Sequence, residues 1–125
     1  MHINEISGEV VDSAVKVHKV LGPGLLESAY KTCLTYELRK RGLRVRTEVA
    51  VPVIYDGLVI DAGYRIDLLV EEMVIVECKA KRTFHSVDMA QALSHLRLSG
   101  HKLALLINFH VKYLKHGIIR VVNNL

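Results

Sequence analysis

Tryptophan is absent from this 125-residue sequence, and proline, cysteine and phenylalanine each occur only twice. Half of the residues are hydrophobic, which is far more than an intrinsically disordered segment contains. The shortage of proline, together with only 8 glycines, excludes collagen-like and low-complexity chains. We therefore expect a single domain over residues 1–125 that folds without a disulfide or a structural metal.

Long apolar runs are also missing. The longest, residues 103–109, is far shorter than the roughly 18 residues that a membrane-spanning helix needs. The N-terminus lacks the basic segment and apolar core of a secretory signal. The two cysteines, Cys33 and Cys78, are then typical of free intracellular thiols. The sequence predicts a cytoplasmic protein that makes no membrane contact.

Positive charge exceeds negative charge only slightly, with 17 lysines and arginines against 13 acidic residues. The net charge of +4 favours a polyanionic partner weakly, because ordinary soluble proteins carry similar charges. The 7 histidines are scattered and form no pair at zinc-binding spacing, so a zinc site is not expected.

Apolar side chains at steps of three and four predict two N-terminal helices, over residues 3–21 and about 25–41. Gly22-Pro23-Gly24 separates them, and Gly42 suits the end of the second. We expect His18 to cap the first helix and to interact with its dipole. The positions expected to face the core are Ile3, Ile6, Val10, Ala14, Val17 and Leu21, then Ala29, Cys33, Leu38 and either Leu34 or Tyr36.

After Gly42 the pattern alternates in the manner of strands. The sequence predicts strands over 44–54, from 58, over 64–70, 74–80 and 103–109, and a short edge strand over 117–122. A helix capped by Ser86 runs to Ser99 and ends at Gly100. This order of elements predicts an α/β fold with a mixed central β-sheet flanked by helices.

Charged residues interrupt two of the apolar strands, 64–70 and 74–80. Alternation places Asp67, Glu77 and Lys79 on one face. A three-residue loop over 71–73 brings Asp67 opposite Glu77, whereas a two-residue loop would send Glu77 to the other face. We expect the three-residue loop. The opposite, core face then contains Ile66, Leu68, Val70, Val74, Val76, Cys78 and Ala80.

Two opposed carboxylates repel each other unless a cation lies between them. Mg²⁺ suits this position, because one or two carboxylates plus water and substrate phosphate complete its coordination. Lys79 would then lie beside the ion. A ladder of salt bridges on a solvated face is the alternative, although the apolar neighbours of these residues weigh against it.

This arrangement resembles the PD-(D/E)xK nuclease superfamily, in which an acid precedes an acid-x-lysine motif across a hairpin. Residues 18–30 are similar to the signature of the GxxExxY family, and segments 36–38, 63–70 and 103–109 also fit it. The residues that carry the resemblance are Asp67, Glu77-Cys78-Lys79 and Gln91, with Gly24, Glu27 and Tyr30 in the N-terminal signature.

The resemblance implies a restriction-endonuclease-like core of two helices followed by a βββαβ unit. It also implies Mg²⁺- or Mn²⁺-dependent cleavage of phosphodiester bonds in DNA or RNA. By position, it assigns the metal to Asp67, Glu77, Glu27 and the carbonyl of Cys78. It assigns Lys79 to the attacking water or the phosphate charge, and Gln91 to the same catalytic site.

Two positions depart from the family pattern. Ile66 replaces the proline before the aspartate, and His95 replaces a tyrosine four residues after Gln91. His95 could contact phosphate, act on a proton or hydrogen-bond Gln91 on the same helix face, and we expect the last.

Basic residues cluster in two places. Lys81 and Arg82, beside the expected site, and Arg65 are candidate nucleic-acid contacts. The cluster at 39–41, with Arg44 and Arg46, is expected at a helix end, with nucleic-acid contact as the alternative. We expect no basic–aromatic interleaving for single-strand stacking, so phosphate contacts would dominate.

Two functions follow. The first is a metal-dependent nuclease, which the complete set of acidic, lysine and glutamine residues favours. The second is a non-catalytic module that retains the nuclease fold and binds nucleic acid or protein, with a homodimer as one form. The small size of the chain favours this second function, because little surface is left for substrate specificity.

Overall fold

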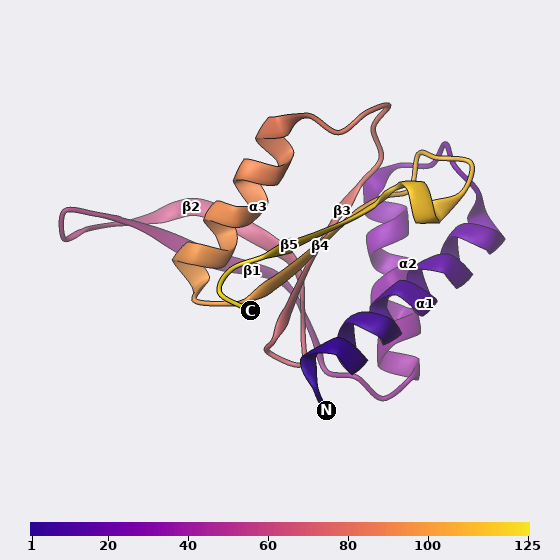
Figure 1. The fold of residues 1–125 in the computed structure, drawn as a ribbon, viewed down its shortest axis with the longest axis horizontal. Helices are drawn as coiled ribbons and strands as arrows, with labels where there is room; N and C mark the ends of the chain where they lie inside the picture. The colour runs from indigo at the N-terminus through magenta and orange to yellow at the C-terminus, as the bar shows by residue number, and fades with distance from the viewer.

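The computed structural model describes residues 1–125, with the side chain of Ala62 left out. A five-stranded sheet in the order β1-β2-β3-β4-β5 has α1 and α2 on one face and α3 on the other (Figure 1). The elements are α1 (Ile3–Leu21), α2 (Glu27–Lys40), β1 (Val45–Tyr55), β2 (Leu58–Val70), β3 (Val74–Lys79), α3 (Ser86–Ser99), β4 (Leu103–Asn108), the 3₁₀ helix η1 (Leu114–His116) and β5 (Ile118–Val122).

The sheet is mixed, as the sequence predicts. Strands β3 and β4 are parallel, with α3 as their crossover, whereas the other neighbouring pairs are antiparallel. This confirms the α/β, restriction-endonuclease-like fold class. Within the described residues, no helix combines the length and the apolar character needed to cross a membrane.

The two N-terminal helices bury the faces that their apolar spacing predicts. In α1 the expected apolar positions from Ile6 to Val17 lie in the core. Of the two alternatives in α2, Leu34 is buried and Tyr36 is exposed. Tyr30, which the sequence interpretation did not place in the core, is fully buried and stacks on Phe109 with ring centroids 4.5 Å apart. Tyr30 therefore joins α2 to the segment that follows β4.

The β1–β2 hairpin is longer than expected, because β2 is one continuous strand from Leu58 to Val70. Its turn uses Asp56 and Gly57 with φ of 50° and 81°, the left-handed conformations of a tight type I′ hairpin. The turn end of this hairpin extends beyond the other three strands of the sheet (Figure 1) and exposes apolar residues such as Tyr55 and Leu58.

The β2–β3 loop has the predicted odd length. Val70 pairs with Val74, and Met73 donates its N–H to the carbonyl of Val70 at 3.0 Å. Glu71 and Glu72 both have positive φ, which closes the loop tightly. The paired residues are Leu68–Val70 with Val74–Val76, so the expected opposition of Asp67 and Glu77 lies one step beyond this pairing and stays a prediction.

One face assignment is wrong. Leu68 and Val70 pack under α1 and α2, but Ile66 packs with Leu69 and Ile75 in a second core cluster on the α3 side. Glu48, on the neighbouring strand opposite this segment, has a φ of 53°. This irregular backbone accompanies the change of face, which strict alternation along β2 does not anticipate.

Two capping predictions also change. The N-cap of α3 is His85 and not Ser86, and its N–H donates to the carboxylate of Asp88 at 2.8 Å. The ring of His18 does not cap α1. Its Nε2 lies 2.8 Å from the carbonyl oxygen of Val111, so it holds the loop after β4 against α1.

The hydroxyl of Tyr30 stabilises the turn between α1 and α2. It donates to the carbonyl of Gly22 at 2.5 Å and accepts the N–H of Leu25 at 3.1 Å. This turn leads directly into Glu27, the first residue of α2. The tyrosine therefore fixes where α2 begins.

Replacing Tyr30 with phenylalanine should leave the carbonyl of Gly22 and the N–H of Leu25 without this hydrogen-bond partner. We expect Y30F to lower the free energy of unfolding by about 1–3 kcal/mol in urea titrations. Y36F is the matched control, because Tyr36 is an exposed tyrosine of the same helix. Equal stability of the two variants would contradict this role of the hydroxyl.

Candidate active site

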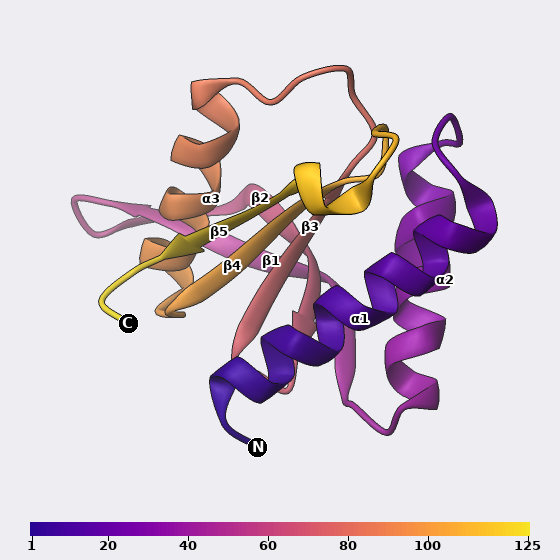
Figure 2. The same ribbon diagram turned by 45° about the vertical axis from the view of Figure 1, so that its right-hand side comes forward.

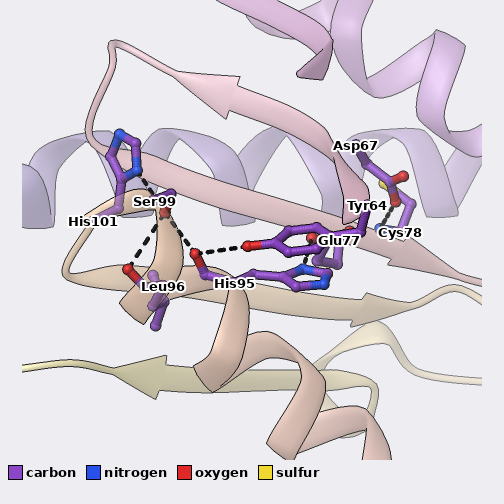
Figure 3. Close-up of polar contacts among 8 residues, drawn as sticks. All are labelled: Tyr64, Asp67, Glu77, Cys78, His95, Leu96, Ser99 and His101. Carbon is purple, nitrogen blue, oxygen red and sulfur yellow. Dashed lines mark hydrogen bonds and ion pairs between the residues drawn. The ribbon is translucent and has the colours of Figure 1, made fainter. Parts of the chain in front are cut away.

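Glu77 is a carboxylate buried inside the sheet. It is only 5% exposed, and its Oε1 lies 3.0 Å from Nδ1 of His95 on α3 (Figure 3). Burial raises the pKa of Glu77, the hydrogen bond from His95 opposes that rise, and the negative charge of Asp67 adds to it. The site therefore contains a carboxylate whose charge is costly and only partly compensated.

His95 is held in place by several contacts. Its ring stacks on Tyr64 with centroids 3.7 Å apart, and the Tyr64 hydroxyl donates to the His95 carbonyl at 3.3 Å (Figure 3). Burial and the nearby Glu77 raise the pKa of Tyr64 to about 12, so its hydroxyl keeps its proton at neutral pH. The expected His95–Gln91 hydrogen bond is wrong, because His95 bonds Glu77 and Gln91 is exposed.

Asp67 ties the strand β2 to β3. Its Oδ2 accepts the backbone N–H of Cys78 at 2.9 Å, while Glu77 turns toward α3 (Figure 3). The thiol of Cys78 lies in the core, where burial and the neighbouring carboxylates of Asp67 and Glu77 raise its pKa well above the usual value. Cys78 is thus a buried apolar residue here, as its position in the strand predicts.

Glu27 and Lys79 lie in the electrostatic surroundings of the same site. Partial shielding of the Glu27 carboxylate from water raises its pKa, the charge of Lys79 lowers it, and that of Asp67 raises it. Lys79 also lowers the pKa of Glu77. The N-terminus of α2, Asp67 within β2 and the C-terminal end of β3 therefore bring three acids and a lysine into one region.

The oxygen donors of this region suit a hard divalent cation. Among the described residues, however, no three side chains of histidine, cysteine, aspartate or glutamate are gathered closely enough to hold an ion. Asp67 and Glu77 each use one oxygen in the hydrogen bonds above. Two carboxylates suffice for Mg²⁺, which takes its other ligands from water and phosphate, so the donor set fits such an ion.

The basic residues expected beside the site differ in availability. Lys81 forms an ion pair with the buried Asp88, with Nζ–O distances of 2.9 and 3.0 Å, whereas Arg82 is exposed. Arg65 donates to the carbonyl of Glu48 at 3.3 Å, on the hairpin side of the sheet. Lys81 therefore holds the segment that follows β3 as well as lying near the site.

The other basic cluster is largely neutralised. Arg46 forms a bidentate pair with Glu72, with both distances 2.7 Å, and Arg44 bonds Glu71. Arg41 pairs with Glu9 and Glu37. These pairs favour the helix-end interpretation of this cluster over the nucleic-acid one.

Comparison with known families connects this geometry to a known group of proteins. The family model described as the PD-(D/E)XK nuclease superfamily matches residues 4–121. Comparison with curated proteins and with solved structures gave no match. The matched segment includes every residue of the site described above.

Glu77 should make folding more favourable at low pH. Because its pKa is raised in the folded protein, its contribution to stability is complete below pH 4.5 and is lost as the pH rises through the raised value. We expect E77Q to unfold at higher urea concentration than the wild type at neutral pH, with the difference vanishing in acid. E72Q is the control, and it should lower stability at neutral pH, because Arg46 lowers the pKa of Glu72 in the folded protein. A neutral-pH loss of stability in E77Q would contradict the raised pKa.

Asp88 should stabilise the protein at neutral pH. The N–H of His85 and the ammonium of Lys81 lower its pKa from 3.8, so its contribution is present above that pH and lost as the pH falls through the lowered value. We expect D88N to cost about 1.5–3 kcal/mol at neutral pH, measured by urea unfolding. D12N, at an exposed position of α1, should change little.

Proposed function

This chain belongs to the PD-(D/E)XK nuclease superfamily, and we propose that it is a divalent-metal-dependent nuclease that hydrolyses phosphodiester bonds of DNA or RNA. The observation that carries the proposal is the joint placement of Asp67 and Glu77 on adjacent strands with Lys79 next along β3. The Gly24, Glu27 and Tyr30 positions support a finer assignment to the GxxExxY family.

In this proposal Asp67 and Glu77 hold Mg²⁺ or Mn²⁺, with the Cys78 carbonyl and Glu27 as further oxygen donors. The ion, when bound, lowers the pKa of water and neutralises charge on the phosphate. The cost of the buried Glu77 charge supports this role, because a cation would remove it. The hydrogen bond from His95 occupies Oε1 of Glu77, so Oε2 would be the oxygen that holds the ion.

Lys79 has a separate role in the proposal. Its ammonium group orients the attacking water or stabilises negative charge that develops on the phosphate. Gln91, which is exposed on α3 one turn before His95, contacts the substrate beside the ion. Arg82 contributes an exposed positive charge for the phosphate backbone on the segment after β3.

A second candidate is a non-catalytic module that binds nucleic acid or protein on the same fold. The observation that favours it is that no three ligating side chains are gathered within the described residues. The two candidates differ in whether the chain binds a divalent ion and cleaves a substrate.

Cleavage assays test the nuclease directly. We expect the wild type to cut labelled single- or double-stranded DNA or RNA with Mn²⁺, and K79M to lower the rate about 10²–10³-fold through loss of its charge. K102Q is the matched control, because Lys102 is an exposed lysine at the other end of the parallel β3–β4 pair. Equal activity of K79M and K102Q would contradict the role of Lys79.

Calorimetric titration with Mn²⁺ provides the second readout of the same proposal. The wild type should bind the ion, and D67N should bind it more weakly because a charged ligand is lost. Absence of binding by the wild type at millimolar metal would favour the non-catalytic module.

A further inference from the structure

A positively charged groove lies outside the residues assigned to the candidate active site. It has a volume of about 630 Å³ and lies between the end of α1, the α1–α2 turn and the loop that carries η1. In Figure 2 this loop and the turn both lie at the upper end of the molecule. The groove residues used below are Lys19, Pro23, Lys112, Tyr113 and Lys115.

The charge of this groove is uncompensated. Lys19, Lys112 and Lys115 are exposed, and none of them forms an ion pair with any acidic side chain that the structure describes. No aspartate or glutamate lies among the described residues of the lining. Three like charges around one groove favour a polyanionic ligand.

Tyr113 adds an aromatic surface to these charges. Its side chain is 56% exposed, the Lys112 ammonium lies 5.5 Å from its ring centroid, and the His116 ring meets it edge-on at 6.2 Å. Exposed aromatic rings among lysines are the platforms on which single-stranded nucleic acids stack their bases. The expectation that the sequence has no basic–aromatic interleaving is therefore wrong for Lys112-Tyr113-Leu114-Lys115.

The groove is preformed. The loop begins where Phe109 donates its N–H to the carbonyl of Lys79 at 2.9 Å, and His18 bonds the carbonyl of Val111 at 2.8 Å. Leu114 lies in the core and anchors η1. Little ordering is then needed when a ligand binds, which limits the entropic cost of binding.

Short segments of the chain connect the groove to the candidate active site. The loop starts beside Lys79, and the opposite wall, Gly22 and Pro23, leads along the chain to Glu27.

We propose that this groove binds single-stranded nucleic acid, with a base stacked on Tyr113 and phosphates held by Lys19, Lys112 and Lys115. The proposal rests on the proposed nuclease function and assigns its substrate class. A duplex fits less well, because its bases are already stacked on one another and offer no free face to the tyrosine ring.

Fluorescence anisotropy without divalent metal measures binding apart from cleavage. The probes are labelled oligo(dT), oligo(U) and a DNA duplex. We expect both single strands to bind more tightly than the duplex, and Y113A to weaken single-strand binding about 5- to 100-fold. Y113W should bind single strands at least as tightly as the wild type, because tryptophan provides a larger stacking surface.

The lysines have their own readout. For K112Q/K115Q, the slope of log K against log salt with oligo(dT) should fall in magnitude by about 1.4, since two phosphate contacts are lost. K102Q, at an exposed lysine away from the groove, should keep the wild-type slope. Circular dichroism melting verifies that each variant is folded.

Three results would overturn the proposal: unchanged single-strand affinity in Y113A, equal salt slopes in K112Q/K115Q and K102Q, or tighter binding of the duplex. Hydrolysis of bis(p-nitrophenyl) phosphate with Mn²⁺ tests the nuclease separately, because this small diester offers no strand to extend into the groove. Predicted oligonucleotide binding without this hydrolysis would support the groove and count against the nuclease.

Discussion

The burial of one carboxylate governs the organisation of this protein. Glu77 lies in β3, where the other buried residues are apolar, so its charge must be compensated by groups that the fold brings to it. His95 reaches it from α3, and Tyr64 holds the His95 ring by stacking. Helix α3 makes the parallel crossover between β3 and β4. Its position over the sheet therefore also brings a hydrogen-bond partner to Glu77.

A second set of contacts connects the N-terminal helices to this centre. Tyr30 stabilises the α1–α2 turn through its hydroxyl and packs its ring on Phe109, which bonds Lys79 through the backbone. His18 then holds the loop after β4. The start of α2, the end of β3 and the loop with η1 are therefore held together by one set of contacts.

Much of the fold was predictable because it follows from local rules. Helix faces, the Asp56-Gly57 turn and the odd-length loop after Val70 depend on residues close in the sequence. The errors arose where distant parts of the chain decide. Ile66 changes face beside an irregular β1, and His95 bonds Glu77 from another element. Lys112 and Tyr113 lie after β4, and six elements separate them along the chain from the end of α1 that completes their groove.

The sequence by itself determined the element order, the two acids on neighbouring strands and the family of the chain, because spacing and register are properties of adjacent residues. Only the tertiary structure decided which charges are free. Lys81 and Arg46 are paired with acids, whereas the lysines around Tyr113 are not. The pairing of a charge depends on which side chains lie across space from it, and sequence separation does not specify that.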